Sequence, residues 1–335
     1  MRTQALAVIL SWMKALGCAC ALASACHALA QPEPQRYPTK PIRLISPFAP
    51  GGGSDRVARM LAPELTEAWG QPVVIDNRPG AGGAVGTELT ARSAPDGYTM
   101  VMATASTIVI NPLVGKVGYD PLRDIAPVVH TSTVPLVLVV HPSVPVKTVK
   151  ELIAHARSSA TRLNYASSGE GTISHLAGEL LKSLTQADMV HVPYRGGGQA
   201  IIDLVAGHVQ TGFLNMLEAV PQIKAGRLRA LGVSTPSASA ALPGVPTVAE
   251  AGVPGFDVIQ WSGVLAPAGV PRGIVLKWNA EVNRLLSRAD VRERLASAGA
   301  DPGGGSPEQF GALVRADIAK WSKAVKSIAI KLQRQ

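Results

Sequence analysis

A glycine-rich segment near the start of the chain has the composition of an anion-binding turn. It reads "FAPGGGSD", residues 48–55, and it stands between an apolar run typical of a strand and a helical pattern of apolar residues. A helix that begins after such a turn presents unpaired backbone N–H groups and the positive end of its dipole. The chemistry that this pattern predicts is the binding of a phosphate or a carboxylate.

The other half of the chain contains a second segment of this kind, "ASSGEGTISH", Ala166–His175. Its serines and threonine supply hydroxyl donors, and its glycines allow a ligand to approach the backbone closely. Two such helix N-termini that face each other across a cleft could bind a carboxylate without a buried arginine, because each carries about half a positive charge.

Nucleotide binding is not supported by the first segment. The glycines at 51–53 lead to Ser54 and Asp55 without the lysine of a phosphate-binding loop, and no GxGxxG pattern is present. A purely structural alternative stays open, in which the segment is an ordinary strand-to-helix turn. In that case Asp55 caps the helix and pairs with Arg59 one turn later.

The sequence contains no recognisable catalytic or metal-binding constellation. The segment "YASSGEG" lacks the first glycine of GxSxG, and no HExxH spacing is present. Glu170 and Asp55 could in principle pair as acid and base, but a solvated loop glutamate is the simpler interpretation. His175 is expected to cap its helix or to lie at the edge of the core. We therefore expect no enzymatic activity, no cofactor and no metal.

The composition of the chain argues against nucleic-acid binding. Its 335 residues carry 32 basic and 23 acidic side chains, a net charge of +9, but no dense tract of lysine or arginine. Only 4% of the residues are aromatic, which disfavours single-strand binding by base stacking. A mildly positive field suits small acidic ligands at least as well.

The first residues, 1–30, have the pattern of a secretory signal peptide. Arg2 and Lys14 precede an apolar run at 15–25, and an Ala-x-Ala cleavage site ends at Ala30. All three cysteines lie within this segment, so cleavage is expected to leave a chain without thiols. A lipid-anchored form, cut before the last cysteine, would normally have a leucine three residues earlier, which is absent here. The mature protein is expected to be soluble and periplasmic.

Beyond the signal segment, strand patterns alternate with helix patterns. Apolar runs at 42–48, 73–76, 100–106 and 134–140 predict strands, and the alternation repeats in the second half. This pattern predicts an α/β fold with mainly parallel sheets, in which ligands bind where strands end. The long apolar runs near 134–140 and 258–266 predict two lobes joined by two crossover strands, with a cleft that can close.

The crossover runs also predict the lobe boundaries. Residues 37–135 together with 258–335 are expected to form one lobe, and residues 136–257 the other. A chain that crosses twice returns to the lobe in which it began. The two helices predicted after the second crossover are therefore expected to pack on the first lobe.

Several longer segments follow one another in a specific order along nearly the whole mature chain: "YPTKPIRLISPFAPGGGSDRVAR", "GQPVVIDNRPGAGGAVGTELTARSAPDGYT", "SSGEGTISHLAGE", "HVPYRGGGQAIIDLVAGHV" and "WSGVLAPAGVP". Through them the chain resembles the Bug-type extracytoplasmic receptors of tripartite tricarboxylate transporters. The resemblance implies a periplasmic binding-protein fold with two α/β lobes that close on a small organic acid. It implies membrane transporter subunits or a sensor as partners, and a monomeric receptor.

The resemblance also implies which residues bind the ligand. In such receptors the loop after the first strand and the glycine/serine loop of the second lobe hold a carboxylate through backbone N–H groups, hydroxyls and ordered waters. Carried over to this sequence, the predicted ligand-binding residues are Phe48, Pro50, Gly51, Gly52, Ser54, Asp55, Ser106, Ser167, Ser168, Gly169, Gly171, Thr172, His175 and Asn215. The predicted anion is thus a carboxylate and not a phosphate.

Two departures from the family pattern leave the identity of the acid open. Leu214 stands where the family often has aspartate, beside Asn215 at the expected pocket floor. The segment "YRGGGQA" has Gly197, Gly198 and Gln199 where the family usually has small residues and a proline.

The chain could deliver its ligand to a transporter, or it could be the ligand-sensing component of a signalling system with the same cleft. A secreted hydrolase would need a nucleophile beside a base, which the sequence does not show.

Overall fold

The computed structural model describes residues 37–158 and 162–328. The predicted signal peptide, residues 1–30, lies outside these ranges. The chain divides into a short unit, Met1–Thr39, and a large unit, Lys40–Gln335. All of the described helices and strands belong to the large unit.

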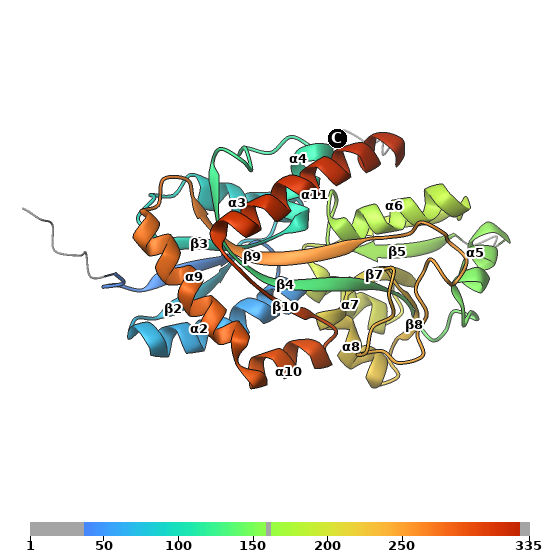
Figure 1. Cartoon of the computed structure of the whole chain (residues 1–335). Coiled ribbons are helices and arrows are strands. Elements are labelled where there is room, and N and C mark those ends of the chain that lie inside the picture. The colour runs from blue at the N-terminus through green and yellow to red at the C-terminus, as the bar shows by residue number, and fades with distance from the viewer. Residues whose placement is uncertain (1–36, 159–161, 329–335) are drawn as a thin grey trace, which may run out of the picture. The chain divides into compact units, whose positions relative to one another are not determined.

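The large unit is built on a mixed sheet with the strand order β2-β1-β3-β9-β4-β7-β5-β6, while β8 and β10 pair with β4 (Figure 1). The strands are β1 (Ile42–Ser46), β2 (Val73–Asn77), β3 (Thr99–Thr104), β4 (Ile125–Val140), β5 (Leu163–Ser167), β6 (Met189–Pro193), β7 (Thr211–Asn215), β8 (Arg229–Val233), β9 (Ile259–Pro267) and β10 (Asp301–Gly304). β1 runs parallel to β2 and β3, and β5 runs parallel to β6 and β7. Each half of the sheet therefore has the parallel strands that strand–helix alternation predicts.

The long strand β4 belongs to both halves of the sheet. Its first part, Ile125–Pro135, pairs antiparallel with β9, and its last part, Leu136–Val140, pairs with β7 and β8. The partner changes beside Pro135, which has no N–H group to donate to a neighbouring strand. The predicted α/β fold with two lobes and crossover strands is confirmed. The lobe boundaries at 135/136 and 257/258 stay a prediction, which this change of partner supports.

Helices lie on both sides of the sheet, with α3, α4, α6 and α11 above it and α2, α7, α8 and α10 below it in the view of Figure 1. The helices are α2 (Gly53–Trp69), η1 (Ala81–Gly83), α3 (Ala84–Ala91), η2 (Ser106–Ile110), α4 (Asn111–Val114), α5 (Val149–Ser158), α6 (Ile173–Thr185), α7 (Gly197–Val205), α8 (Met216–Lys224), α9 (Arg272–Ser287), α10 (Ala289–Ser297) and α11 (Pro307–Ile328). Two helices were expected after the second crossover, and that prediction is wrong, because α9, α10 and α11 all follow β9. α9 packs on β4 and α2, whereas α11 contacts β4, η2 and α6.

Helix α2 illustrates how the local sequence places the pocket. Val57, Leu61 and Leu65 recur at helical spacing, and all three are buried. The helix ends at Gly70, which has a left-handed φ of 63° and donates its N–H group to the carbonyl of Thr66. With this face packed inward, the first turn of the helix is held at the end of β1, where the pocket lies.

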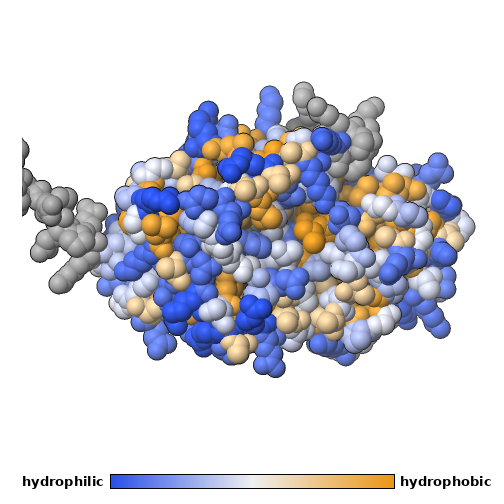
Figure 2. Space-filling model, viewed as in Figure 1, coloured by the Kyte–Doolittle hydropathy of each residue, from blue (hydrophilic) through white to orange (hydrophobic). Residues whose placement is uncertain are grey.

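One face of the large unit is seen in the space-filling view. Figure 2 shows a mostly hydrophilic face, on which apolar residues form small separate patches. Within the described ranges, no helix combines the length and the apolar composition needed to cross a membrane. The apolar side chains lie mainly around the sheet, where Trp261, Trp278, Tyr165 and Phe213 are among the largest that are fully buried.

Candidate ligand-binding site

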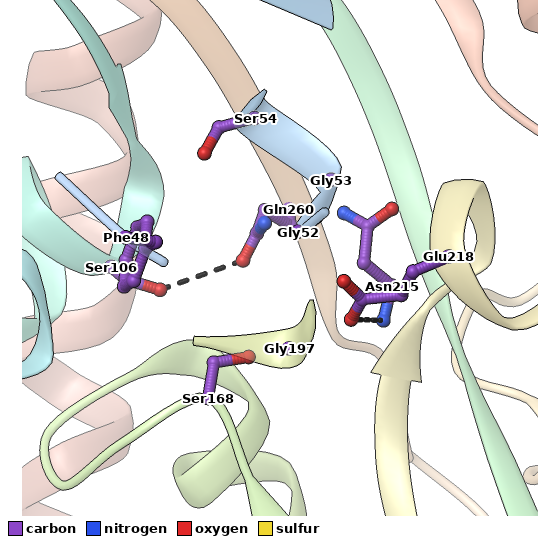
Figure 3. A pocket seen from close by; sticks show the side chains of 10 residues that line it. All are labelled: Phe48, Gly52, Gly53, Ser54, Ser106, Ser168, Gly197, Asn215, Glu218 and Gln260. Carbon is purple, nitrogen blue, oxygen red and sulfur yellow. Dashed lines mark hydrogen bonds between the residues drawn. The ribbon is translucent and has the colours of Figure 1, made fainter. Parts of the chain in front are cut away.

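Loops from the two halves of the sheet meet around a pocket with an empty volume of about 300 Å³. The pocket lies where α2, α7 and α8 begin, and η2 and β9 complete its wall (Figure 3). It is lined by Phe48, Gly52, Gly53, Ser54, Ser106, Ser168, Gly197, Asn215, Glu218 and Gln260. No lysine or arginine is among these lining residues.

The first glycine segment forms the loop between β1 and α2, and the buried side chain of Asp55 holds its shape. Asp55 accepts hydrogen bonds from the N–H group of Gly51 (2.9 Å), from Asn77 Nδ2 (2.8 Å) and from Arg59 Nε (2.8 Å). Burial raises the pKa of Asp55, but these bonds outweigh it, so the pKa lies below its usual value. The predicted pair with Arg59 is confirmed. The predicted N-cap role is wrong, because Gly52 is the N-cap residue.

The first turn of α2 offers its backbone to the pocket. Gly52, Gly53 and Ser54 line the pocket, and the first N–H groups of a helix have no acceptor within the helix. A side chain at position 53 would not fit, because its Cβ atom would lie 2.6 Å from Asn215 Cγ. The glycine therefore allows the α2 N-terminus to approach the end of β7 closely.

The second glycine segment, between β5 and α6, satisfies most of its own polar groups. The hydroxyls of Ser167 and Thr172 both donate to the Gly169 carbonyl, at 3.1 and 2.6 Å. The first N–H group of α6, at Ile173, donates to Ser106 Oγ at the start of η2 (3.0 Å). This N-terminus thus presents fewer open donors to a ligand than the sequence pattern predicts.

His175 lies beneath the second loop and not in the pocket wall. Its Nδ1 accepts a hydrogen bond from the N–H group of Gly171 (3.2 Å), and its ring stacks on His191 at 3.9 Å between centroids. Burial lowers the pKa of His175 to about 4 and that of His191 to about 3. Both rings are therefore neutral near pH 7, and His175 supports the loop from inside.

The structure brings some of the predicted ligand-binding residues together in the pocket and leaves others in supporting positions. The pocket wall contains Phe48, Gly52, Ser54, Ser106, Ser168 and Asn215. Gly169 lines a neighbouring pocket. The remaining predicted residues shape the two loops without lining either pocket, and they are Pro50, Gly51, Asp55, Ser167, Gly171, Thr172 and His175.

The predicted ligand-binding residues do not include four of the lining residues: Gly53, Gly197, Glu218 and Gln260. Gly53 lies within the predicted loop at 48–55, and Gly197 lies in a segment that departs from the family pattern. A signal existed for the other two. Gln260 is a polar residue inside an apolar strand, and Ser106 Oγ lies 3.5 Å from its Oε1. Glu218 follows Asn215 by three residues, which is the spacing of a capping box. That spacing predicts a helix start but not a carboxylate in a pocket.

Glu218 is the charged side chain of the pocket wall. It is 1% exposed, and its Oε1 accepts a hydrogen bond from the N–H group of Asn215 (3.2 Å). Burial raises the pKa of Glu218 to about 7, although the N–H groups of Asn215 and Gly53 and the charge of Arg56 oppose the shift. The N–H group of Gly53 lies near the carboxylate, but Oε2 has no partner with hydrogen-bond geometry among the described residues.

A second pocket, with an empty volume of about 590 Å³, adjoins the first. The two share Phe48 and Ser168 in their walls. The loops around them touch, since the N–H group of Ala49 donates to the Arg195 carbonyl at 3.0 Å. This contact joins the β1–α2 loop of one half to the β6–α7 loop of the other half.

A protein-family model described as the tripartite tricarboxylate transporter family receptor matches residues 57–330. A Pseudomonas protein, the UPF0065 protein in the tcbD-tcbE intergenic region, is 40% identical over 290 residues, which are 86% of each chain. Protein BugT of Bordetella pertussis is 38% identical over 299 residues, 89% of this chain and 92% of BugT. The predicted resemblance to Bug-type receptors is confirmed.

Solved structures of similar proteins have the same fold. The R. palustris protein Rpa4515 with adipate is 38% identical, with a TM-score of 0.85, over 88% of this chain and 98% of that one. MatC from Rhodopseudomonas palustris with bound malate is 34% identical, with a TM-score of 0.83, over 86% of this chain and all of that one (100%). The periplasmic binding protein BugD is 31% identical, with a TM-score of 0.85, over 88% and 99% of the two chains.

Proposed function

This chain belongs to the receptor family of tripartite tricarboxylate transporters, and we propose that it captures a small carboxylate-bearing ligand in the pocket of Figure 3 and delivers it to a membrane transporter of that class. Receptors of this family are periplasmic solute-binding proteins. Two similar proteins hold adipate and malate, both of which are carboxylates.

The observation that carries the proposal is the start of α2 at the pocket wall. Gly52, Gly53 and Ser54 line the pocket at the positive end of a helix of 17 residues. The backbone N–H groups and the helix dipole favour an anion there. Because no lysine or arginine lines this pocket, backbone N–H groups and hydroxyls are the groups that would bind the carboxylate.

The same pocket would serve a ligand-sensing component of a signalling system, which is the alternative that the fold leaves open. In the proposal the chain is a monomer that is exported by its signal peptide and has no catalytic activity. Among the described residues, no group of three or more histidine, cysteine or acidic side chains is placed to hold a metal ion.

A thermal-shift screen of the mature protein against organic acids, amino acids and aromatic carboxylates tests the proposal. A ligand at about 100 times its dissociation constant should stabilise the protein by roughly 2.7 kcal/mol. Calorimetric titration of the best ligand then gives its affinity. Failure of every carboxylate to bind would contradict the proposal, and hydrolysis of generic ester substrates would favour an enzyme instead.

A further inference from the structure

The pocket contains a carboxylate of its own, which the capture of an organic acid does not explain. Glu218 enters the wall from the first turn of α8, beside Asn215 and opposite the starts of α2 and α7 (Figure 3). Its side chain is almost fully removed from solvent, at 1% exposure. A buried acidic side chain without a partner is costly, so its presence here needs a reason.

The two carboxylate oxygens of Glu218 differ in their contacts, although the N–H group of Gly53 lies near the carboxylate as a whole. Oε1 accepts the N–H group of Asn215 and so completes the capping box of α8. Oε2 has no hydrogen-bond partner among the described residues, and it faces the starts of α2 and α7. Oε2 lies close to the start of α2, since a Cβ atom added at Gly52 would be 3.8 Å from this oxygen.

The neighbouring chain is shaped around this carboxylate. A Cβ atom at position 197 would overlap both oxygens of Glu218, so the glycine there leaves the space that the carboxylate fills. A Cβ atom at position 198 would overlap the Pro50 carbonyl, so α7 approaches the β1–α2 loop as closely as its backbone permits. The placement of Glu218 therefore depends on Gly197 and is not an incidental rotamer at the surface.

Among the residues that the structure describes, no buried lysine or arginine is paired with Glu218. Arg56 is the positively charged group that lowers its pKa, but Arg56 is exposed and its Nε donates to the Gly51 carbonyl (3.0 Å). No lysine or arginine lines the pocket. A ligand that brought its own cation to Oε2 would supply both the missing hydrogen bond and the missing charge.

We propose that Glu218 is the specificity-determining residue of this pocket and that its Oε2 accepts a hydrogen bond from an ammonium group of the ligand, so that the receptor takes amino-substituted carboxylates. The inference rests on the proposed function, since the carboxylate of the ligand is held at the start of α2. A ligand with no donor at this point leaves the buried acceptor unpaired, and a second carboxylate at this point meets a like charge. A site built for a polar group rejects analogues that lack it.

Matched pairs of ligands test the inference in the wild-type protein. The pairs are succinate with aspartate, adipate with 2-aminoadipate, and butyrate with 2-aminobutyrate, each titrated calorimetrically at pH 7 into the mature chain. In the pair that fits the pocket best, the amino-substituted member should bind at least tenfold more tightly. This comparison needs no variant, so it remains decisive even if a substitution at position 218 prevents folding.

The substitution Glu218→Gln then assigns the preference to one atom. Glutamine has the same shape and keeps an oxygen for the N–H group of Asn215, but it replaces the free acceptor with an NH2 donor. The variant should lose the tenfold preference or reverse it.

Glu250→Gln is the matched control for this substitution. Glu250 accepts the N–H group of Thr247 (3.0 Å), three residues earlier, in the same way that Glu218 accepts that of Asn215. It is exposed and lies outside the pocket, so its substitution should leave both affinities of a pair unchanged.

The outcomes separate this inference from the function on which it rests. If no carboxylate binds the wild type, the proposed function fails and the inference fails with it. If carboxylates bind but the amino-substituted members have no advantage, the receptor function stands and the role of Glu218 is overturned. The same conclusion follows if Glu218→Gln folds, as shown by its thermal unfolding, and keeps the preference of the wild type.

Discussion

The loop that begins α2 and the loop that begins α6 have the same pattern of strand, glycines and helix. The backbone N–H groups at the two helix starts nevertheless have different surroundings. At α2, Asp55 binds the loop itself, while Gly52, Gly53 and Ser54 line the pocket. At α6, the N–H group of Ile173 is already bound to Ser106. A helix N-terminus therefore binds a ligand only where the rest of the fold leaves its N–H groups open.

The start of α8 shows a third outcome of the same pattern. There a side chain of the chain itself, Glu218, lies at the point where three helices begin, and it satisfies the N–H group of Asn215. The start of α2 and the unpaired Oε2 of Glu218 thus lie in one pocket. This pairing suits a ligand with an anion at one end and a donor at the other.

The largest effect that the comparison predicts is in the α6 loop. Gly171 has a φ of +71°, and a Cβ atom there would lie 2.6 Å from Asn111 Oδ1. Gly171→Val should therefore destabilise the protein by roughly 2–4 kcal/mol, from left-handed strain and overpacking together. Urea unfolding measures the loss.

Gly244→Val is the control for this substitution, because Gly244 has a φ of +82° but no atom within 4 Å of the added Cβ. It should cost only the strain, about 1–2 kcal/mol. Equal losses in the two variants would show that the α6 loop is not tightly packed against Asn111.

The pH dependence of stability tests the burial of Glu218. Its pKa in the folded protein is raised from 4.5 to about 7, so its contribution to stability is fully present below pH 4.5 and is lost as the pH rises through 7. The glutamine of Glu218→Gln does not titrate. The free energy of unfolding of the variant, relative to that of the wild type, should therefore rise between pH 5 and pH 8, by at most about 3 kcal/mol. Urea unfolding of both proteins at the two pH values gives this difference. A difference that stays constant would mean that the carboxylate is hydrated.

Ser106 and Ser168 both line the pocket, and Ser106 also accepts the first N–H group of α6. Ser106→Ala leaves the buried N–H group of Ile173 without its acceptor, which should cost about 1–3 kcal/mol of stability. Ser168→Ala should leave stability nearly unchanged and weaken ligand binding by about 0.5–1.5 kcal/mol. Urea unfolding and calorimetric titration of both variants measure these two effects. If Ser168→Ala lost stability and Ser106→Ala lost only affinity, the start of α6 would be the helix end that binds the ligand.

The smallest effect is expected at the arginines of α2. Arg56 bonds to the Gly51 carbonyl and Arg59 to Asp55, and neither lines the pocket. Arg56→Gln or Arg59→Gln should therefore change ligand affinity by less than about tenfold, or 1.4 kcal/mol. A thousandfold loss in a folded variant would show that a guanidinium holds the carboxylate.

The sequence pattern predicted the architecture well because strand–helix alternation and helix starts are local properties. The apolar runs located the strands of both halves, and the run near 134–140 is the part of β4 that pairs with β7 and β8. The earlier part of β4 was missed, because Pro127 and the polar residues at 130–133 interrupt the apolar pattern and only pairing with β9 extends the strand.

The sequence by itself determined the family, the two-lobed α/β fold and the positions of the glycine loops, since these follow from residue order and spacing. Only the tertiary structure decided which helix ends are open. Ser106 and Ile173 are 67 residues apart in the chain, and Glu218 meets Gly52 and Gly197 only when three helices begin at one point. A hydrogen-bond donor is available to a ligand only if no other part of the fold has taken it, and contacts between distant residues decide that.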